Sequence, residues 1–187
     1  MKRCLFLCAV PLFLSGCLST TPPAGVDWPV VWNGTLPKAS SSDYGVVRIS
    51  SVDVRAPYAG RPFAVLRADG SVAFDPYNAY AAAPGRLIEG MAEDAFAASG
   101  RFAAVTGNGS SVAADVTAEI SVVRLALDCR TTDVRKAVAT VAVRLVRNRR
   151  IVAFARGEGT ADASEPDFSA AFSSALSMAF VDALGGL

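Results

Sequence analysis

The chain has 187 residues with 18 Lys and Arg, 17 Asp and Glu and no His, and 52% of its residues are hydrophobic. This hydrophobic share excludes a disordered tail, and the near-neutral charge balance excludes a protein that binds polyanions through bulk charge. Histidine is the residue most used for proton transfer near neutral pH, for zinc ligation and for orienting a serine or cysteine nucleophile. Its absence therefore argues against most familiar hydrolases and zinc enzymes.

The first residues have the pattern of an export signal. Two basic residues precede an apolar run from Cys4 to Leu14 that is too short to stay in a bilayer as a spanning helix. The run ends at Leu14-Ser15-Gly16-Cys17, which resembles the bacterial lipoprotein signal box. In that box the bond between Gly16 and Cys17 is cut, and Cys17 receives diacylglycerol on its thiol and an acyl chain on its new amino group. We therefore expect a signal peptide at residues 1–16; an ordinary signal peptide with an incidental cysteine is the alternative.

Acylation of Cys17 would fix the protein to a membrane surface, because two or more acyl chains hold stably where one holds only reversibly. Leu18 and Ser19 follow the cysteine, and by resemblance to Gram-negative lipoproteins the lack of Asp beside it favours the outer membrane. Removal of the signal also removes two further cysteines, so Cys129 is left as a lone thiol. No disulfide is expected within the mature chain, and we interpret Cys129 as a filler at a strand end.

Residues 17–43 are predicted to form the lipidated cysteine and a flexible tether. The stretch from Leu18 to Asp43 is rich in Ser, Thr, Pro and Gly and has no sustained period. Fully stretched, it would reach about 85 Å. Inside it lies an apolar run, WPVVW, from Trp28 to Trp32. Two interpretations remain, a short strand docked on the domain, which we favour, and a pair of aromatic anchors in the membrane interface.

Residues 44–187 are predicted to form one domain. Its first part is β-rich, with VVRISSVDV followed by FAVLR and SVAF, which flank Ala68-Asp69-Gly70 and so indicate a hairpin. A helix should begin at Pro84, which is tolerated in a first turn, and end at Ser99-Gly100. Its acidic residues fall on the face opposite the apolar one, as on a solvated helix. A short strand from Phe102 to Val105 should follow.

Two long strands come next, from Asp115 to Leu127 and from Ala137 to Arg147. The second strand alternates between apolar and mixed positions, which is typical of a sheet with unlike faces. In the first strand the apolar phase changes between Val122 and Val123, which indicates a β-bulge or a change in what covers the strand. A turn at Asn148-Arg149 should lead into a third strand, IVAFARG.

The last helix is expected from about Pro166 to Leu184. It has a strong apolar face, and its other face lacks the basic residues of a membrane-surface helix, so it should pack on the sheet. The fold class is therefore α/β, α+β by segregation, with a single mixed sheet of about five to six strands covered by two main helices. The residues assigned to the polar face of this last helix are Ser169, Ser173, Ser177 and Asp182.

The segment APYAGRPFAVLRADGSVAFDPYNAYAAAPGRLIEGMAEDAFAASGRFAAV, from Ala56 to Val105, resembles the ABC-type transport auxiliary lipoprotein family. Members include PqiC-like lipoproteins that accompany Mce-type transport systems. The long strands and the terminal helix beyond Val105 agree with the family in order and spacing. Within the segment, the resemblance rests on Pro57-Tyr58, the apolar hairpin, Phe74, Tyr77, Tyr80, Pro84, Leu87 and Ser99-Gly100-Arg101-Phe102.

The resemblance implies a non-catalytic auxiliary component of an ABC/Mce-type system that moves lipids or other hydrophobic molecules across the envelope. It implies a lipid anchor in the outer membrane, facing the periplasm, and a fold like the amino-terminal domain of TolB. Mce-domain and permease components are the implied partners, and self-association is left open. No catalytic residue, cofactor or metal is implied, and the near-neutral, exported chain is not expected to bind nucleic acid.

Two groups of residues are candidate contact sites. Tyr77 and Tyr80 are interpreted either as a partner surface or as core packing. A group of arginines lies around one hairpin, and Arg suits bidentate contact with phosphate. If that group binds an anion, the chain would instead be a lipoprotein that binds phospholipid or an envelope polymer directly, in a structural role; a solvated hairpin tip is the other interpretation. These arginines are Arg144, Arg147, Arg149 and Arg150, with Arg156 nearby.

An enzyme is the remaining alternative, through Asp/Glu or Ser/Lys chemistry. The sequence has no G-x-S-x-G elbow and no phosphate-binding Gly-rich loop, and no nucleophile motif accompanies Lys136. We therefore expect a protein that acts by binding.

Overall fold

The computed structural model describes residues 25–39, 43–131, 134–164 and 166–187. The predicted signal peptide, its cleavage site and Cys17 lie outside these residues. Within them the chain forms nine strands and two helices. In chain order they are β1 (Val26–Trp28), β2 (Val46–Ile49), β3 (Asp53–Val54), β4 (Pro62–Arg67), β5 (Val72–Tyr80), α1 (Pro84–Ser99), β6 (Ala104–Thr106), β7 (Val116–Cys129), β8 (Lys136–Arg147), β9 (Arg150–Asp162) and α2 (Phe168–Gly185).

All nine strands belong to one mixed sheet in which β7 is central. On one side β7 pairs with β8, and β8 with β9, both antiparallel. On the other side it pairs in turn with β2, β3 and β4, each parallel to it. The sheet continues through β6 beyond β2, and through β5 and β1 beyond β4. The predicted fold class is confirmed, with more strands than the five to six expected.

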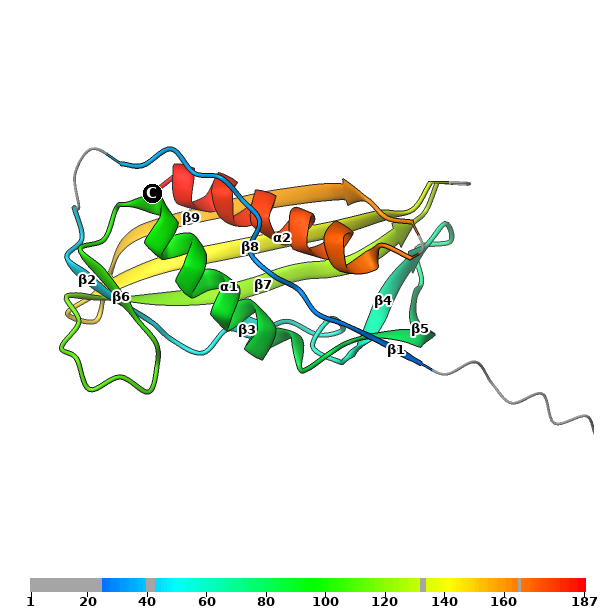
Figure 1. The fold of residues 1–187 in the computed structure, drawn as a ribbon, viewed down its shortest axis with the longest axis horizontal. Helices are drawn as coiled ribbons and strands as arrows, with labels where there is room; N and C mark the ends of the chain where they lie inside the picture. Colours follow the sequence, from blue (N-terminus) through cyan, green and yellow to red (C-terminus); the bar gives the residue numbers. More distant parts are fainter. Residues whose placement is uncertain (1–24, 40–42, 132–133, 165) are drawn as a thin grey trace, which may run out of the picture.

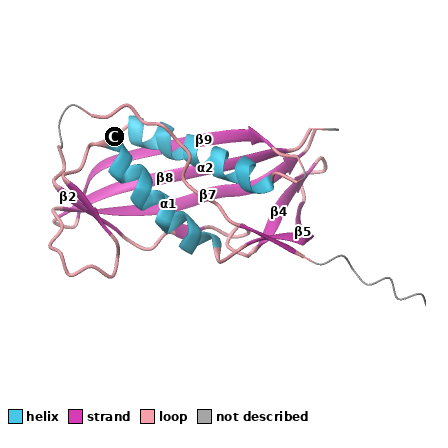
Figure 2. Cartoon of the chain, in the orientation of Figure 1, coloured by secondary structure: helices cyan, strands magenta, loops and turns pink. Residues whose placement is uncertain are grey.

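Both helices lie on one face of this sheet, as Figures 1 and 2 show. α1 contacts β2, β3 and β6, α2 covers β8 and β9, and the two helices contact each other. The main core fills the space between helices and sheet. A smaller buried cluster of Ala64, Ala126 and Val138 uses side chains that alternate along their strands with those of the main core.

Local signals account for α1 and for the β4–β5 hairpin. Pro84 occupies the first turn of α1, and Gly100 ends the helix in the left-handed conformation with φ 67°. In the hairpin, Gly70 has φ 82°, and the Asp69 carboxylate accepts a hydrogen bond from the Ser71 N–H at 2.9 Å. The helix bounds and the hairpin predicted from the sequence are confirmed.

The long strands also follow their predicted pattern. The register between β7 and β8 shifts between Val122 and Arg124, where the change of apolar phase predicts a bulge. Asn148 and Arg149 connect β8 to β9 with φ values of 50° and 62°. Two consecutive positive φ values match the twist of a two-residue hairpin, so the tip is a tight type I′ turn.

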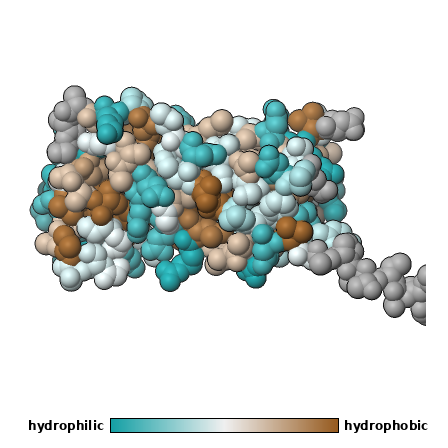
Figure 3. Space-filling model, in the orientation of Figure 1, coloured by the Kyte–Doolittle hydropathy of each residue, from teal (hydrophilic) through white to brown (hydrophobic). Residues whose placement is uncertain are grey.

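α2 is a core helix. Among the described residues it alone is long and apolar enough to cross a membrane by length and composition, yet 61% of it is buried within the fold. Figure 3 shows that hydrophobic atoms on the helix-covered side are divided into separate patches by hydrophilic ones, with no continuous apolar band. The predicted packing of this helix on the sheet is therefore confirmed.

β9 is an edge strand, and one side chain covers part of its edge. The Glu158 backbone N–H donates to Asp182 Oδ2 of α2 at 3.1 Å. Unpaired backbone groups on an edge invite pairing with another chain, so this bond protects the middle of β9. Asp182, which the sequence assigns to the polar face of α2, thus has a structural partner.

Candidate functional site

Residues 25–39, which we call the strap, cross the outer side of α2 (Figure 1). The flexible tether predicted for residues 17–43 is therefore wrong for the strap. Three serines spaced one helical turn apart on α2 hold it in place. Ser169 Oγ donates to Pro29 O at 2.7 Å, Ser173 Oγ accepts from the Val31 N–H at 3.0 Å, and Ser177 Oγ accepts from the Asn33 N–H at 3.1 Å.

The strap changes the environment of the polar face of α2. Ser173 and Ser177, which the sequence assigns to this polar face, are only 1% and 2% exposed. Buried hydroxyls need hydrogen-bond partners, and the backbone N–H groups of the strap supply them. The serine face of α2 thus binds the strap through hydrogen bonds.

Aromatic packing holds the start of the strap. The Trp28 ring meets the Phe168 ring edge-on at 5.8 Å between centroids, and its indole N–H donates to Asn78 Oδ1 at 2.8 Å. Val30 is buried, and Trp32 packs against the main core. Of the two interpretations of WPVVW, docking on the domain is confirmed, although the strand itself is β1 and ends at Trp28.

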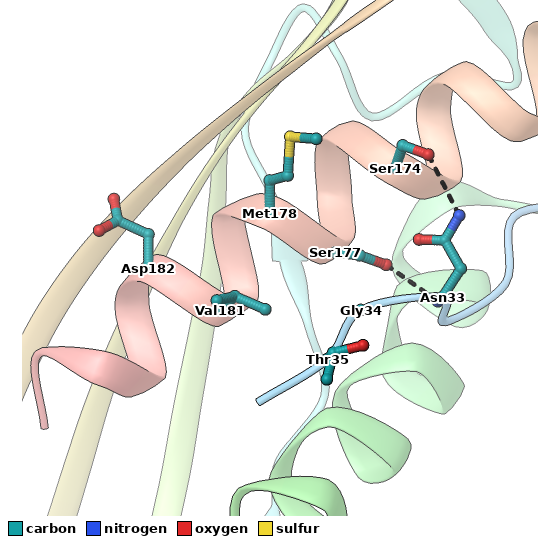
Figure 4. Close-up of a pocket in the computed structure, with 8 residues that line it drawn as sticks. All are labelled: Asn33, Gly34, Thr35, Ser174, Ser177, Met178, Val181 and Asp182. Carbon is teal, nitrogen blue, oxygen red and sulfur yellow. Dashed lines mark hydrogen bonds between the residues drawn. The ribbon is translucent and has the colours of Figure 1, made fainter. Parts of the chain in front are cut away.

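A groove of about 490 Å³ lies between the strap and α2 (Figure 4). Ser177 and Val181 face the strap, and Met178 extends from the other side of the helix. Asn33 bonds to both the Ser174 and the Ser177 hydroxyls, and Met178 and Val181 offer apolar contacts. Its lining consists of Asn33, Gly34, Thr35, Ser174, Ser177, Met178, Val181 and Asp182.

The two candidate tyrosines have different environments. Tyr80 is 1% exposed, and its ring lies 4.7 Å from the Phe63 ring and 5.2 Å from the Phe172 ring, centroid to centroid. The partner-surface interpretation of Tyr80 is therefore wrong, because the side chain is part of the core. Tyr77 is 47% exposed and remains available to a partner.

The Tyr80 hydroxyl yields a stability prediction. It finds no hydrogen-bond partner among the described residues, and burial raises the pKa of the phenol well above its usual value. Leaving a buried hydroxyl unpaired costs about 1–3 kcal/mol, so Tyr80→Phe should increase the free energy of unfolding, by about 1 kcal/mol. Urea denaturation followed by circular dichroism measures the change. A loss of stability would show that the hydroxyl is paired in solution.

The predicted arginine group is only partly brought together. Arg147, Arg149 and Arg150 lie at the β8–β9 tip, where Arg147 and Arg150 are cross-strand partners. Arg147 also lines a polar hollow of about 560 Å³ together with Asp43 and Asp115. The negative charges of Asp43 and Asp115 in this hollow would repel a phosphate.

The other two arginines lie away from that tip, along the strands. The Arg144 guanidinium lies 5.7 Å from the centroid of the Phe154 ring, in a cation–π contact. Arg156 forms an ion pair with Glu158 at 3.2 Å. Anion contact by the arginine group remains a prediction, and the geometry confines it to the tip.

The described residues offer little for redox or metal chemistry. Cys129 is a free thiol at the end of β7, as predicted, and burial raises its pKa, so the reactive thiolate is disfavoured. Within the described ranges no group of three or more His, Cys, Asp or Glu side chains could hold a metal ion.

Comparison with solved structures gives the fold. No protein-family model matches the chain, and no curated protein matches it. Protein XCC0632 from Xanthomonas campestris, of the family DUF330, superposes with a TM-score of 0.70 at 19% identity, over 86% of this chain and 93% of that one.

Two further structures are more distant. A PelC dodecamer from Paraburkholderia phytofirmans has a TM-score of 0.45 at 17% identity, over 79% of this chain and 92% of that one. A candidate lipoprotein from Caulobacter crescentus has a TM-score of 0.32 at 18% identity, over 50% and 69%. The conclusion rests on the first comparison: the chain has the fold of a DUF330 protein.

Proposed function

We propose that this protein is an outer-membrane-anchored periplasmic lipoprotein and a non-catalytic auxiliary component of an ABC/Mce-type transport system for lipids or other hydrophobic molecules. Two independent features support the proposal. The sequence around Cys17 resembles a lipoprotein signal box, and the described domain has the fold of a DUF330 protein. The transport role itself comes from the resemblance of the segment from Ala56 to Val105 to auxiliary lipoproteins.

The short link between Cys17 and the folded domain supports the membrane-anchored part of the proposal. β1 begins at Val26, so the chain from Cys17 to the sheet spans at most about 30 Å even when fully extended. A flexible tether ending at Asp43 would allow about 85 Å. An acylated Cys17 would thus hold the domain close to its own membrane, as suits an adaptor that works at one membrane.

The lipid anchor is tested by comparing the wild type with Cys17→Ser in cells. Wild-type protein should incorporate radiolabelled palmitate and fractionate with the outer membrane, because its acyl chains give stable anchoring. Cys17→Ser should lose the label completely and leave the membrane fraction. Crosslinking of the membrane-bound wild type should recover an Mce-domain or permease component.

Cys129→Ser is the matched control, since it removes the other cysteine of the mature chain and should retain the palmitate label. Absence of label from the wild type would refute the lipoprotein assignment. Normal labelling together with crosslinks to unrelated envelope proteins alone would refute the transport role and leave the anchor in place.

A further inference from the structure

The end of the molecule where the strap begins carries exposed apolar side chains. Figure 1 shows β1, β4 and β5 together at this end of the sheet. On β5, Phe74 is 53% exposed, Tyr77 is 47% exposed and Val72 is also exposed. Val26 of β1 is also exposed, but it pairs with Asn78 of β5 and so lies on the face of the buried Tyr80, opposite Phe74. We call Val72, Phe74 and Tyr77 the apolar end.

The backbone presents these side chains in fixed positions. Phe74 pairs across the hairpin with Ala64, whose short side chain is already buried in the smaller cluster. Beyond Phe74 the ladder is irregular, and the Asp75 carboxylate accepts hydrogen bonds from the Tyr77 N–H at 2.8 Å and the Asn78 N–H at 3.0 Å. The pairing with Ala64 thus fixes the backbone at Phe74, and the hydrogen bonds to Asp75 fix the backbone at Tyr77.

The two ends of the sheet lie at different distances from the anchor. β8 has 12 residues and is about 40 Å long, and its tip with Arg147 lies at the end opposite β4 and β5. The link from Cys17 to Val26 reaches at most about 30 Å. Cys17 therefore lies within reach of the apolar end, and the arginine tip is at the far end of the sheet.

The chemistry of this end suits the interfacial region of a bilayer. Clustered exposed apolar side chains mark an interaction surface, and aromatic residues favour the boundary between headgroups and acyl chains. Two ion pairs lie nearby, Arg61 with Asp27 and Arg130 with Asp128, each at 2.6 Å. Contact with lipid would use the apolar and aromatic side chains of this end.

We propose that Val72, Phe74 and Tyr77 insert into the interfacial region of the bilayer that holds the lipid anchor. This orients the long axis of the sheet away from the membrane and presents the β8–β9 tip to the periplasm. The inference rests on the proposed function, because the acylated Cys17 brings this end to the bilayer.

Site-directed spin labelling of the full acylated chain tests the contact. In a Cys129→Ser background, a nitroxide is attached at Phe74→Cys, at Tyr77→Cys or at Ile151→Cys, and each protein is reconstituted in phosphatidylcholine vesicles. Ile151 is the matched control, since it is a 60% exposed apolar residue next to the β8–β9 tip. Collision of each label with a water-soluble nickel complex and with oxygen is then measured.

Labels at positions 74 and 77 should collide with the nickel complex several-fold less often than the label at 151, and more often with oxygen, which partitions into lipid. In the unacylated Cys17→Ser protein without vesicles, all three labels should be equally open to the nickel complex. Equal access at 74, 77 and 151 in an acylated, vesicle-bound protein would overturn the inference and leave the lipoprotein assignment standing. Mass spectrometry that finds Cys17 unacylated would overturn both.

Discussion

Replacing Gly159 with Val should lower the free energy of unfolding by about 3 kcal/mol or more, which is the upper range for overpacking a core. A Cβ atom at position 159 would overlap the backbone carbonyl oxygen of Ala175 and lie 2.8 Å from the backbone N of Ala179. Backbone of a packed helix cannot rotate aside as a side chain can, so α2 would have to move off β9. Urea denaturation monitored by far-UV circular dichroism gives the free energy directly.

Gly90→Ala is the control for this variant. Gly90 lies within α1, and nothing lies within 4 Å of a Cβ atom placed there. Alanine is the better helix former, so Gly90→Ala should stabilise the protein by about 0.5–1 kcal/mol. If Gly159→Val unfolded at the same urea concentration as the wild type, the close approach of α2 to β9 would be wrong.

The close approach depends on small residues on both elements. Gly157 and Gly159 alternate along β9 and so face the same side, toward α2. Opposite them, Ala175, Ala179 and Ala183 recur at every fourth position of the helix and are fully buried. The sequence carries this pattern, but apolar periodicity alone does not show which glycines and alanines will meet.

The parts of the fold that the sequence predicts correctly are set by local chemistry. The bounds of α1 follow from Pro84 and Gly100, and the tight turns follow from Asp69-Gly70 and Asn148-Arg149. The β7 bulge follows from a change of apolar phase at Val122. Each of these signals lies within the few residues it governs, so no knowledge of the rest of the chain is needed.

The strap and the serine face of α2 depend on distant partners. Composition alone predicts a linker for residues 25–39, and the sequence pattern assigns Ser169, Ser173 and Ser177 only to a polar helix face. The docking of the strap and the burial of the serines depend on each other, because the strap backbone supplies the hydrogen-bond donors and acceptors that the serines need. The signal that could have revealed them is the coincidence of an apolar WPVVW run in a polar linker with a serine at every fourth position of the last helix.

Tyr77 and Tyr80 show the same limit at the candidate contact site. Strict alternation would place residues 77 and 79 on one face and 78 and 80 on the other, but the sequence does not show which face is covered. The irregular β4–β5 pairing after Phe74 and the aromatic rings of Phe63 and Phe172 decide that Tyr80 is buried. The membrane-facing assignment of Phe74 and Tyr77 likewise depends on the three-dimensional position of β1.

Truncating Phe172 to Ala should lower the free energy of unfolding by about 3–5 kcal/mol. Phe172 is fully buried on α2, and its ring lies 4.7 Å from the Phe63 ring, centroid to centroid, and 5.2 Å from the Tyr80 ring. Removing it leaves a cavity and breaks two aromatic pairs, each worth about 0.5–1.5 kcal/mol beyond its buried area. A domain is typically stable by about 5–15 kcal/mol, so the variant should keep only part of its stability.

Met178→Ala on the same helix controls for any effect of truncation as such. Met178 is 50% exposed beside the groove, so its loss removes little buried area and should change the free energy of unfolding by no more than about 0.5 kcal/mol. The Phe172 cluster also supports the strap, because Phe63 contacts Phe168, and Phe168 contacts Trp28. Trp fluorescence of Phe172→Ala should therefore shift to the red below the main unfolding transition, as the strap loosens first. A fluorescence transition that coincides with the circular dichroism transition would show that strap and core unfold as one unit.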